Sequence, residues 1–149
     1  MIFIANDHGG VELKNKIIKF FDKNNIEFVD LGTNSTESVN YVIYAKKLCK
    51  KVLENSENKG ILICKSGLGM SICANRFKGI RAGLCYNKKA SLLARKHNDC
   101  NVLVLKGKSV FWKNIVKNFL NTPFEGGRHQ ARIESIDQSA VSKTLSIKK

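Results

Sequence analysis

The sequence lacks the features that mark membrane and secreted proteins. No uninterrupted apolar run approaches the roughly 18 residues that a membrane helix needs. The first residues, Met1 to Ala5, include no basic leader, and their apolar stretch is too short for a signal peptide. The sequence also contains no linker, internal repeat or low-complexity stretch. We therefore expect one cytoplasmic domain over residues 1–149, long enough for one hydrophobic core, with no membrane partner.

The cysteine patterns of disulfide frameworks and zinc sites are missing as well. The five cysteines are an odd number without a CxxC pair, and the three histidines lie far apart in the sequence. A disulfide framework or a structural zinc site is therefore not expected, and a reducing cytosol fits better. We predict no metal and no other cofactor, although distant ligands can still converge in the folded chain.

Acidic residues are scarce, with 12 Asp and Glu against 26 Lys and Arg and a net charge of +14. Such a charge is typical of nucleic-acid-binding proteins, but here an RNP-like aromatic motif is missing, and no basic run exceeds two residues. Lysines such as Lys14, Lys19 and Lys23 recur at helical spacing, which favours solvated helix faces. We therefore expect no nucleic-acid partner. A positive field also attracts small phosphorylated metabolites.

Short apolar runs alternate with longer segments of helical periodicity. The predicted strands cover residues 2–5, 26–31, 60–64, 80–85 and 101–105, and three of these runs are nearly continuous in Ile, Leu and Val. Helical patterns lie at about 11–21, 42–53, 70–77, 90–94 and 115–120, and Pro123 follows the last of them. This alternation predicts an α/β fold with parallel strands, right-handed crossovers and helices on both faces. A further helical pattern, from about Arg128 to Val141, follows a hinge at Gly126-Gly127.

The residues that follow the strands are the first candidates for function, because ligands of open parallel sheets bind beyond the carboxyl ends of the strands. Asp7 and His8 could bind hydroxyls and an anion, or could cap a helix at a glycine turn. Cys64 opens a glycine loop that runs to Gly69 and can present backbone N–H groups to an anion. The loop has neither the Walker order nor a dinucleotide fingerprint. Cys64 is either a thiolate favoured by Lys65 and the helix end, or a buried structural cysteine.

More distant cationic residues complete the set of candidates. His97 ends the fourth helical segment, where a lone histidine is most often a cap or a surface residue. Lys108 follows the fifth predicted strand. Arg128 and Arg132 are four residues apart and share a helix face, so they could grip a phosphate together, with ordinary surface charge as the alternative.

Taken together, these segments resemble the ribose-5-phosphate isomerase type B family, which includes the galactose-6-phosphate isomerase subunits. The matching segments lie in family order at residues 7–10, 61–64, 66–72, 74–82, 97–99, 101–103 and 125–129. The resemblance implies a Rossmann-like, three-layer α/β/α fold with a five-stranded parallel sheet and an extended C-terminal helix. It also implies a metal-independent enzyme that interconverts ribose 5-phosphate and ribulose 5-phosphate. The implied assembly is a homodimer, or a tetramer of such dimers, with shared active sites and a C-terminal segment from about residue 124 that reaches the partner subunit.

The resemblance also assigns roles to residues of this chain. Cys64 matches the proton-abstracting base, and His97 matches the residue that assists ring opening. Ser66 matches a threonine or serine position that could relay a proton, within the anion-hole backbone of residues 65–69. The implied substrate contacts are Asp7, His8, Lys65, Ser66, Gly67, Leu68, Gly69, Asn98, Lys108, Arg128 and Arg132.

Departures from the family pattern bear on the substrate. Lys65 stands where glycine is common, and Lys108 keeps the charge but not the bidentate geometry of the family's arginine. The segment 40–44 keeps Tyr41 and Tyr44 but lacks the acids and the proline of the family segment. The remaining alternatives are a hexose 6-phosphate isomerase, a sugar-phosphate-binding protein without catalysis, and a nucleic-acid-binding protein.

Overall fold

The computed structural model describes residues 1–138, in which five strands and six α-helices alternate along the chain. The strands are β1 (Ile2–Asn6), β2 (Phe28–Asp30), β3 (Lys59–Cys64), β4 (Ala82–Leu84) and β5 (Val102–Lys106). The helices are α1 (Val11–Lys23), α2 (Tyr41–Val52), α3 (Leu68–Ala74), α4 (Lys88–Lys96), α5 (Trp112–Asn121) and α6 (Arg128–Ile136). A 3₁₀ turn, η1 (His8–Gly10), connects β1 to α1.

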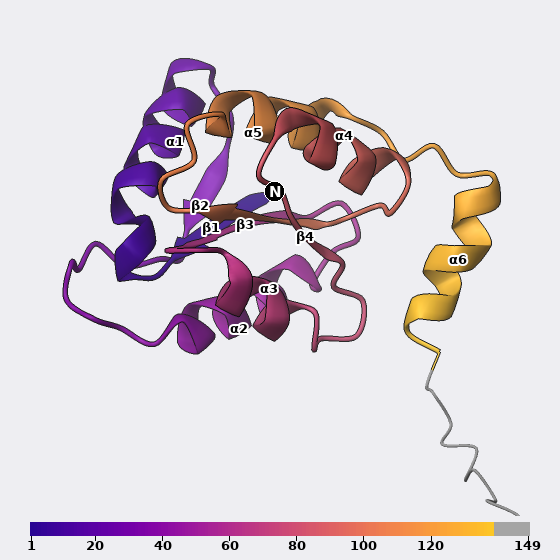
Figure 1. Cartoon of the computed structure of the whole chain (residues 1–149), viewed down its shortest axis with the longest axis horizontal. Helices are drawn as coiled ribbons and strands as arrows, with labels where there is room; N and C mark the ends of the chain where they lie inside the picture. The colour runs from indigo at the N-terminus through magenta and orange to yellow at the C-terminus, as the bar shows by residue number, and fades with distance from the viewer. Residues whose placement is uncertain (139–149) are drawn as a thin grey trace, which may run out of the picture.

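The strands form one parallel sheet in the order β2-β1-β3-β5-β4. Helices α1, α4 and α5 cover one face of the sheet, and α2 and α3 cover the other (Figure 1). Alternate side chains of the central strand β3 serve the two faces: Ile61 and Ile63 belong to the core under α1 and α5, while Leu62 and Cys64 belong to the core under α2 and α3. The predicted three-layer α/β/α fold is confirmed.

The three continuous apolar runs of the sequence form the centre of the sheet, where β1, β3 and β5 are covered on both faces. The predicted strands at 26–31 and 80–85 are shorter in the structure, because β2 and β4 lie at the edges and pair with one neighbour each. Among residues 1–138, we find no helix with both the length and the apolar character needed to cross a membrane.

The prediction that Lys14 lies on a solvated helix face is wrong. Lys14 is fully buried, and its Nζ lies 3.0 Å from a carboxylate oxygen of Asp30. The same ammonium donates hydrogen bonds of 2.9 Å to the Thr33 carbonyl and to Asn34 Oδ1. Lys19, on the same helix, is exposed as predicted. A buried charge is tolerated when it is paired and hydrogen-bonded, so Lys14 anchors the segment after β2 to α1.

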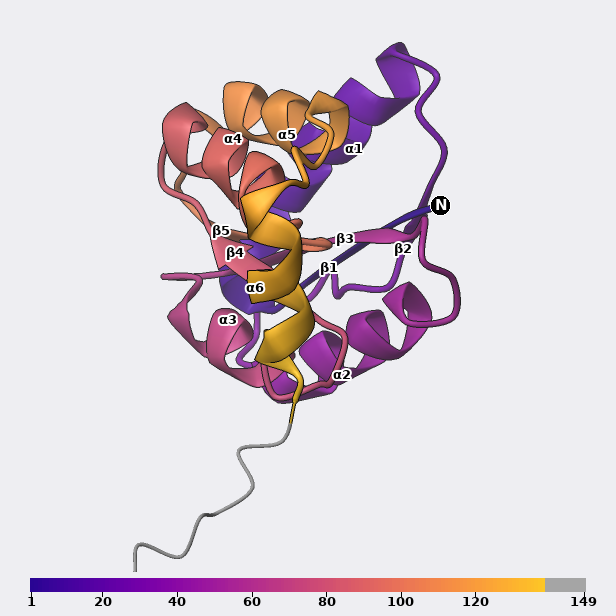
Figure 2. The same ribbon diagram turned by 90° about the vertical axis from the view of Figure 1, so that its right-hand side faces the viewer.

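Helix α6 lies off the β4 edge of the sheet and stands apart from the layers (Figures 1 and 2). Gly126 and Gly127 before it have φ angles of 70° and 57°, in the region that favours glycine. Just after the helix, Asp137 accepts a 2.8 Å hydrogen bond from the Gly79 N–H. The predicted helical pattern continues to Val141, which lies outside the described residues.

Candidate active site

The loop after β3 turns tightly around the Cys64 side chain. The Gly67 N–H donates a hydrogen bond to Cys64 Sγ at 3.2 Å. Gly67 has a φ of 83°, and a Cβ added there would lie 2.4 Å from the end of the Leu84 side chain, so the turn depends on glycine. The next amide, of Leu68, donates to Ser66 Oγ at 3.2 Å. The sulfur is therefore held beside a turn of backbone N–H groups.

The loops after β1 and β5 pack against this turn, because both strands flank β3 in the sheet. The Asp7 N–H donates to a carbonyl of β3 at 3.1 Å, and the Gly107 N–H donates to the Cys64 carbonyl at 2.8 Å. A Cβ added at Gly107 would lie 2.1 Å from the carbonyl oxygen of Gly9. The three loops therefore meet backbone to backbone at the carboxyl end of the sheet.

Asp7 and His8 are oriented by hydrogen bonds. Asp7 is 5% exposed, and its Oδ1 accepts from the Gly9 N–H at 2.8 Å, which is the local cap that the sequence left open as an alternative. His8 Nδ1 accepts from the Val39 N–H at 3.1 Å. In the neutral ring the proton is then on Nε2, which gives His8 a donor for an anion.

Two tyrosines hold the loop from its sides: Tyr41, from the segment 40–44 that the sequence analysis connected with the substrate, and Tyr86, to which it gave no role. Tyr86 lies after β4, and its hydroxyl donates to the Ser66 carbonyl at 3.0 Å. The ammonium of Lys106 lies 5.1 Å from the centroid of the Tyr86 ring. The Tyr41 ring packs so closely on Gly69 that a Cβ there would lie 2.7 Å from it. The exposed predicted site residues at this end are Lys65, Ser66, Leu68 and Lys108.

The cysteines differ in their surroundings. Burial raises the pKa of Cys49 and of Cys85 to about 12, and that of Cys100 to about 11. These three side chains lie in the core and remain protonated thiols near neutral pH. Cys64 is also buried, at 5% exposed, but its sulfur ends a strand and accepts a backbone N–H. Cys64 belongs to the core under α2 and α3 as well, and it differs from the other three cysteines in its position at the carboxyl end of β3.

His97 and Asn98 lie at the opposite end of the sheet from Cys64. Both residues follow α4 and precede β5, whereas Lys106, at the far end of β5, pairs with Cys64. A strand of five residues spans about 17 Å. His97 and Cys64 of one chain are therefore not side by side.

A second group of side chains surrounds His97. Its ring stacks on that of His129, with 4.3 Å between the ring centroids and 17° between the planes. His97 Nε2 lies 3.8 Å from Glu125 Oε2. His129 is 6% exposed, and burial, followed by the charges of Arg128 and His97, lowers its pKa below the usual value. The sequence gave no role to Glu125 or His129, although both lie in the matched segment 125–129.

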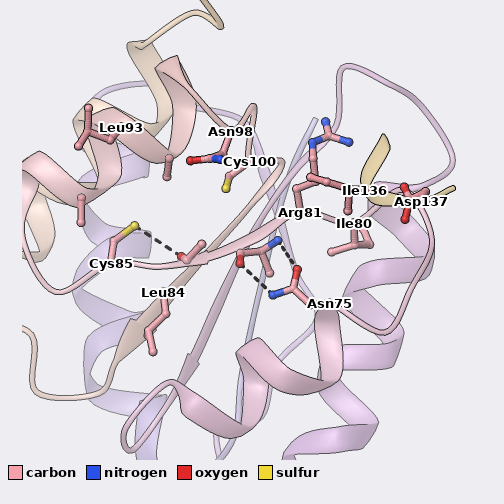
Figure 3. Close-up of a pocket in the computed structure, with 14 residues that line it drawn as sticks. Asn75, Ile80, Arg81, Leu84, Cys85, Leu93, Asn98, Cys100, Ile136 and Asp137 are labelled. Carbon is pink, nitrogen blue, oxygen red and sulfur yellow. Dashed lines mark hydrogen bonds between the residues drawn. The ribbon is translucent and has the colours of Figure 1, made fainter. Parts of the chain in front are cut away.

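The two predicted phosphate-binding arginines belong to this second group. Arg128 is exposed, and its Nη1 lies 4.0 Å from Glu125 Oε1. Arg132 lines a hollow of about 410 Å³ together with His97 and Asn98. A neighbouring hollow of about 540 Å³ lies between β4, α4 and the end of α6, and Asn98 points into it (Figure 3).

The structure thus sorts the predicted site residues into two groups. The carboxyl-end group holds Asp7, His8, the residues 64–69 and Lys108. The amino-end group holds His97, Asn98, Arg128 and Arg132, with Glu125 and His129 added by the fold. Within one chain the two groups are at different ends of the sheet, so the predicted site residues do not form a single site there.

Comparisons with known proteins identify the family. The chain matches the ribose/galactose isomerase family model over residues 2–136. It is 41% identical over 133 residues to ribose-5-phosphate isomerase B of Escherichia coli, covering 87% of this chain and 89% of that protein. The structure of ribose 5-phosphate isomerase B from Thermotoga maritima is similar with a TM-score of 0.89 and 49% identity, covering 93% of this chain and 97% of that chain. The structure of ribose-5-phosphate isomerase B from Mycoplasma genitalium, solved with bound ribulose-5-phosphate, is similar with a TM-score of 0.87 and 41% identity. The match covers 92% of this chain and 93% of that chain.

These similarities confirm the resemblance that the sequence motifs predicted, and with it the expectation of an isomerase at the level of the family. They extend over nearly the whole described chain, from β1 to the end of α6. The chain therefore belongs to the ribose/galactose isomerase family.

Proposed function

We propose that this protein interconverts D-ribose 5-phosphate and D-ribulose 5-phosphate through a cis-enediolate, in an active site that two copies of the chain build together. The observation that carries the proposal is the position of Cys64, whose sulfur ends the central strand beside a turn of backbone N–H groups, in a chain that matches the family over residues 2–136. The ribulose-5-phosphate bound in the Mycoplasma genitalium relative supports a small phosphorylated sugar as the ligand.

Moving a carbonyl between C1 and C2 requires a base and a stabiliser for the enediolate. The Cys64 thiolate removes the C2 proton, the electron pair of that bond forms the C1–C2 double bond, and the proton returns to C1. Ser66 relays the hydroxyl proton from O2 to O1. Backbone N–H groups of residues 65–69 hold the enediolate oxygens, and each preorganised donor typically contributes about 3 kcal/mol. The Gly67 N–H also stabilises negative charge on the sulfur.

The furanose ring has to open before the proton can move. His97 donates a proton to the ring oxygen, Asp7 assists at the sugar hydroxyls, and Asn98 contacts the sugar. Because His97 lies at the other end of its own sheet, the histidine that meets Cys64 comes from a second copy. The separation of the two groups within one chain supports a homodimer with shared sites.

The phosphate is gripped from both copies. His8 offers its Nε2–H and Lys108 its ammonium from one chain, while Arg128 and Arg132 come from the other. A fixed phosphate positions the reacting carbons beside the catalytic groups, and this positioning raises the reaction rate. The segment from about residue 124 carries the arginines across, and the two glycines before α6, together with the distance of this helix from the layers, support such a reach.

A hexose 6-phosphate isomerase is the second candidate, because the family includes galactose isomerases by name. One observation favours this candidate: the Tyr41 ring packs on Gly69, and Tyr41 belongs to the segment 40–44, which departs from the family pattern. Comparing kcat/KM for ribose 5-phosphate with that for galactose 6-phosphate and allose 6-phosphate decides between the two.

The test of the proposal is ketose formation from ribose 5-phosphate by the purified full chain. We expect turnover that is unchanged by EDTA. A protein that binds ribose 5-phosphate but forms no ketose, and exchanges no C2 proton with solvent, would be a sugar-phosphate sensor and would overturn the proposal.

A further inference from the structure

Three potential metal ligands from separate segments meet in the amino-end group. His97 follows α4, Glu125 lies between α5 and α6, and His129 lies in the first turn of α6. One ligand atom of each residue lies within 4.8 Å of the other two. The convergence is a property of the fold, since the spacing of these residues in the sequence matches no metal-binding motif.

His129, the buried member of this cluster, has an unsatisfied nitrogen. The residue is 6% exposed, and its Nε2 has no hydrogen-bond partner within residues 1–138. A buried nitrogen that has lost water and gained no partner costs free energy. A metal ion binds the lone pair of an imidazole nitrogen and would remove that cost.

We propose that His97, Glu125 and His129 bind a divalent transition-metal ion of the Zn²⁺ class, and that the bound ion inhibits the enzyme. Two imidazoles and one carboxylate are ligands that Zn²⁺ accepts, whereas Mg²⁺ and Ca²⁺ prefer oxygen ligands throughout. The stack brings the two histidines together, and because an imidazole lone pair lies in the plane of its ring, the rings must tilt apart for both nitrogens to bind one ion. A tetrahedral Zn²⁺ site places its ligand atoms about 3.3 Å apart. The ligand atoms here lie within 4.8 Å of one another, so the three side chains must move closer together on binding.

The surrounding charges limit the strength of this site. The Glu125 carboxylate has Lys96 Nζ at 3.9 Å and Arg128 Nη1 at 4.0 Å. Long ion pairs between partly exposed side chains are weak, so Glu125 can turn to a metal at small cost. The same cations repel a dication. We therefore expect reversible binding rather than a permanently filled site.

The inhibition rests on the proposed function. A His97 nitrogen that binds a metal does not deliver a proton to the ring oxygen of the sugar. The same ion links α4 to α6 through His129 and so restrains the helix that carries Arg128 and Arg132. Metal binding therefore lowers turnover without being required for it.

The binding test uses Co²⁺, whose visible absorption reports its ligands, and Zn²⁺ as the competitor, on the full chain freed of metal. We expect one equivalent per chain, and an affinity lowered at least about tenfold in His129→Gln and in Glu125→Gln. Cys64→Ala is the matched control: it removes a competing sulfur ligand and should bind Co²⁺ as the wild type does. Circular dichroism and melting temperature show that each variant is folded. Equal binding by the wild type and both cluster variants, or no saturable binding, overturns the site.

The activity test follows ribose 5-phosphate turnover against Zn²⁺ concentration, with each protein compared with its own metal-free rate. His129→Gln should need at least about tenfold more Zn²⁺ for half-inhibition. Binding at the cluster without loss of turnover overturns the inhibitory role. Because the Co²⁺ spectrum does not depend on catalysis, a protein that binds Co²⁺ but never forms ketose refutes the proposed function and not the metal site.

Discussion

The two groups of site residues are built in different ways. The carboxyl-end group rests on backbone hydrogen bonds between neighbouring strands and loops, such as the 2.8 Å bond from the Gly107 N–H to the Cys64 carbonyl. The amino-end group rests on side chains: the stack of His97 on His129, and ion pairs of Glu125 at 3.8 to 4.0 Å. The sheet fixes the first group. In the second group, His97 and Asn98 are held by the turn between α4 and β5, whereas His129, Arg128 and Arg132 depend on where α6 lies.

The two groups suit parts of the proposed reaction that differ in how precisely their side chains must be positioned. A base and an anion hole work only when they are held within fractions of an ångström, and strand ends supply that accuracy. Cations that attract a phosphate act over longer distances and tolerate a mobile support. The proposed dimer thus joins a rigid half-site from one copy to an adaptable half-site from the other.

The largest expected effect is on the rigid half-site. Cys64→Ala should lower kcat by about 10³-fold or more, because it removes the base while leaving the phosphate-binding residues in place. Turnover is measured as ketose formation, and ribose 5-phosphate binding by calorimetry. Cys73→Ala, at a partly exposed cysteine of α3, is the control and should keep turnover. Turnover of Cys64→Ala near the wild-type rate would remove this sulfur from the mechanism.

Mixing two inactive variants tests whether the halves come from different copies. Cys64→Ala and His97→Ala chains, unfolded and refolded together, should form hybrid dimers in which one of the two sites has both residues. About half of the dimers are hybrids, so about one quarter of wild-type activity should return. Each variant refolded by itself is the control. If no activity returns although hybrid dimers form, each site lies within one chain.

A smaller effect is expected in the adaptable half-site. Arg132→Ala should raise the KM for ribose 5-phosphate by about 10- to 100-fold with a smaller change in kcat, since a charge-assisted hydrogen bond contributes about 1.5–3 kcal/mol. Lys19→Ala, at an exposed cation of α1, controls for the loss of one positive charge. An unchanged affinity for both inorganic phosphate and substrate would show that α6 does not grip the phosphate.

The smallest expected effect concerns Lys14, which anchors the segment after β2 to α1. Lys14→Ala should lower the free energy of unfolding by about 1–3 kcal/mol, because Asp30 and the Thr33 carbonyl lose their buried partner. Lys16→Ala breaks an exposed pair with Glu12 and should cost less than about 0.5 kcal/mol. Urea unfolding measures both. Equal losses in the two variants would mean that burial of Lys14 does not stabilise the fold.

The centre of the fold was predictable because burial on both faces of a strand leaves a continuous apolar run in the sequence. The same reasoning overestimated the lengths of β2 and β4, because both strands lie at the sheet edges and part of each apolar run stays outside the sheet. The convergence of Asp7 and Cys64 was also predictable, since the carboxyl ends of neighbouring parallel strands always meet.

The remaining contacts depend on tertiary geometry that local patterns do not carry. The burial of Lys14 depends on Asp30, which a different element places above the helix. The stack of His97 on His129 depends on the path of the chain through α5 and the segment 122–127, so neither helix pattern reveals it. Glu125 and His129 lie in the segment 125–129, whose match to the family pattern was a signal that could have pointed to them. The match did not indicate which residues they contact.

The missing side chain at Gly107 has a consequence for how this protein can vary. The carbonyl of Gly9 occupies the space that a methyl group at Gly107 would need, so the loops after β1 and β5 interlock without any intervening atoms. Lengthening or exchanging either loop would force the other to move, and Cys64 with it. We therefore expect changes of substrate preference to come from replaced surface groups such as Lys65 and Lys108, rather than from inserted or deleted backbone.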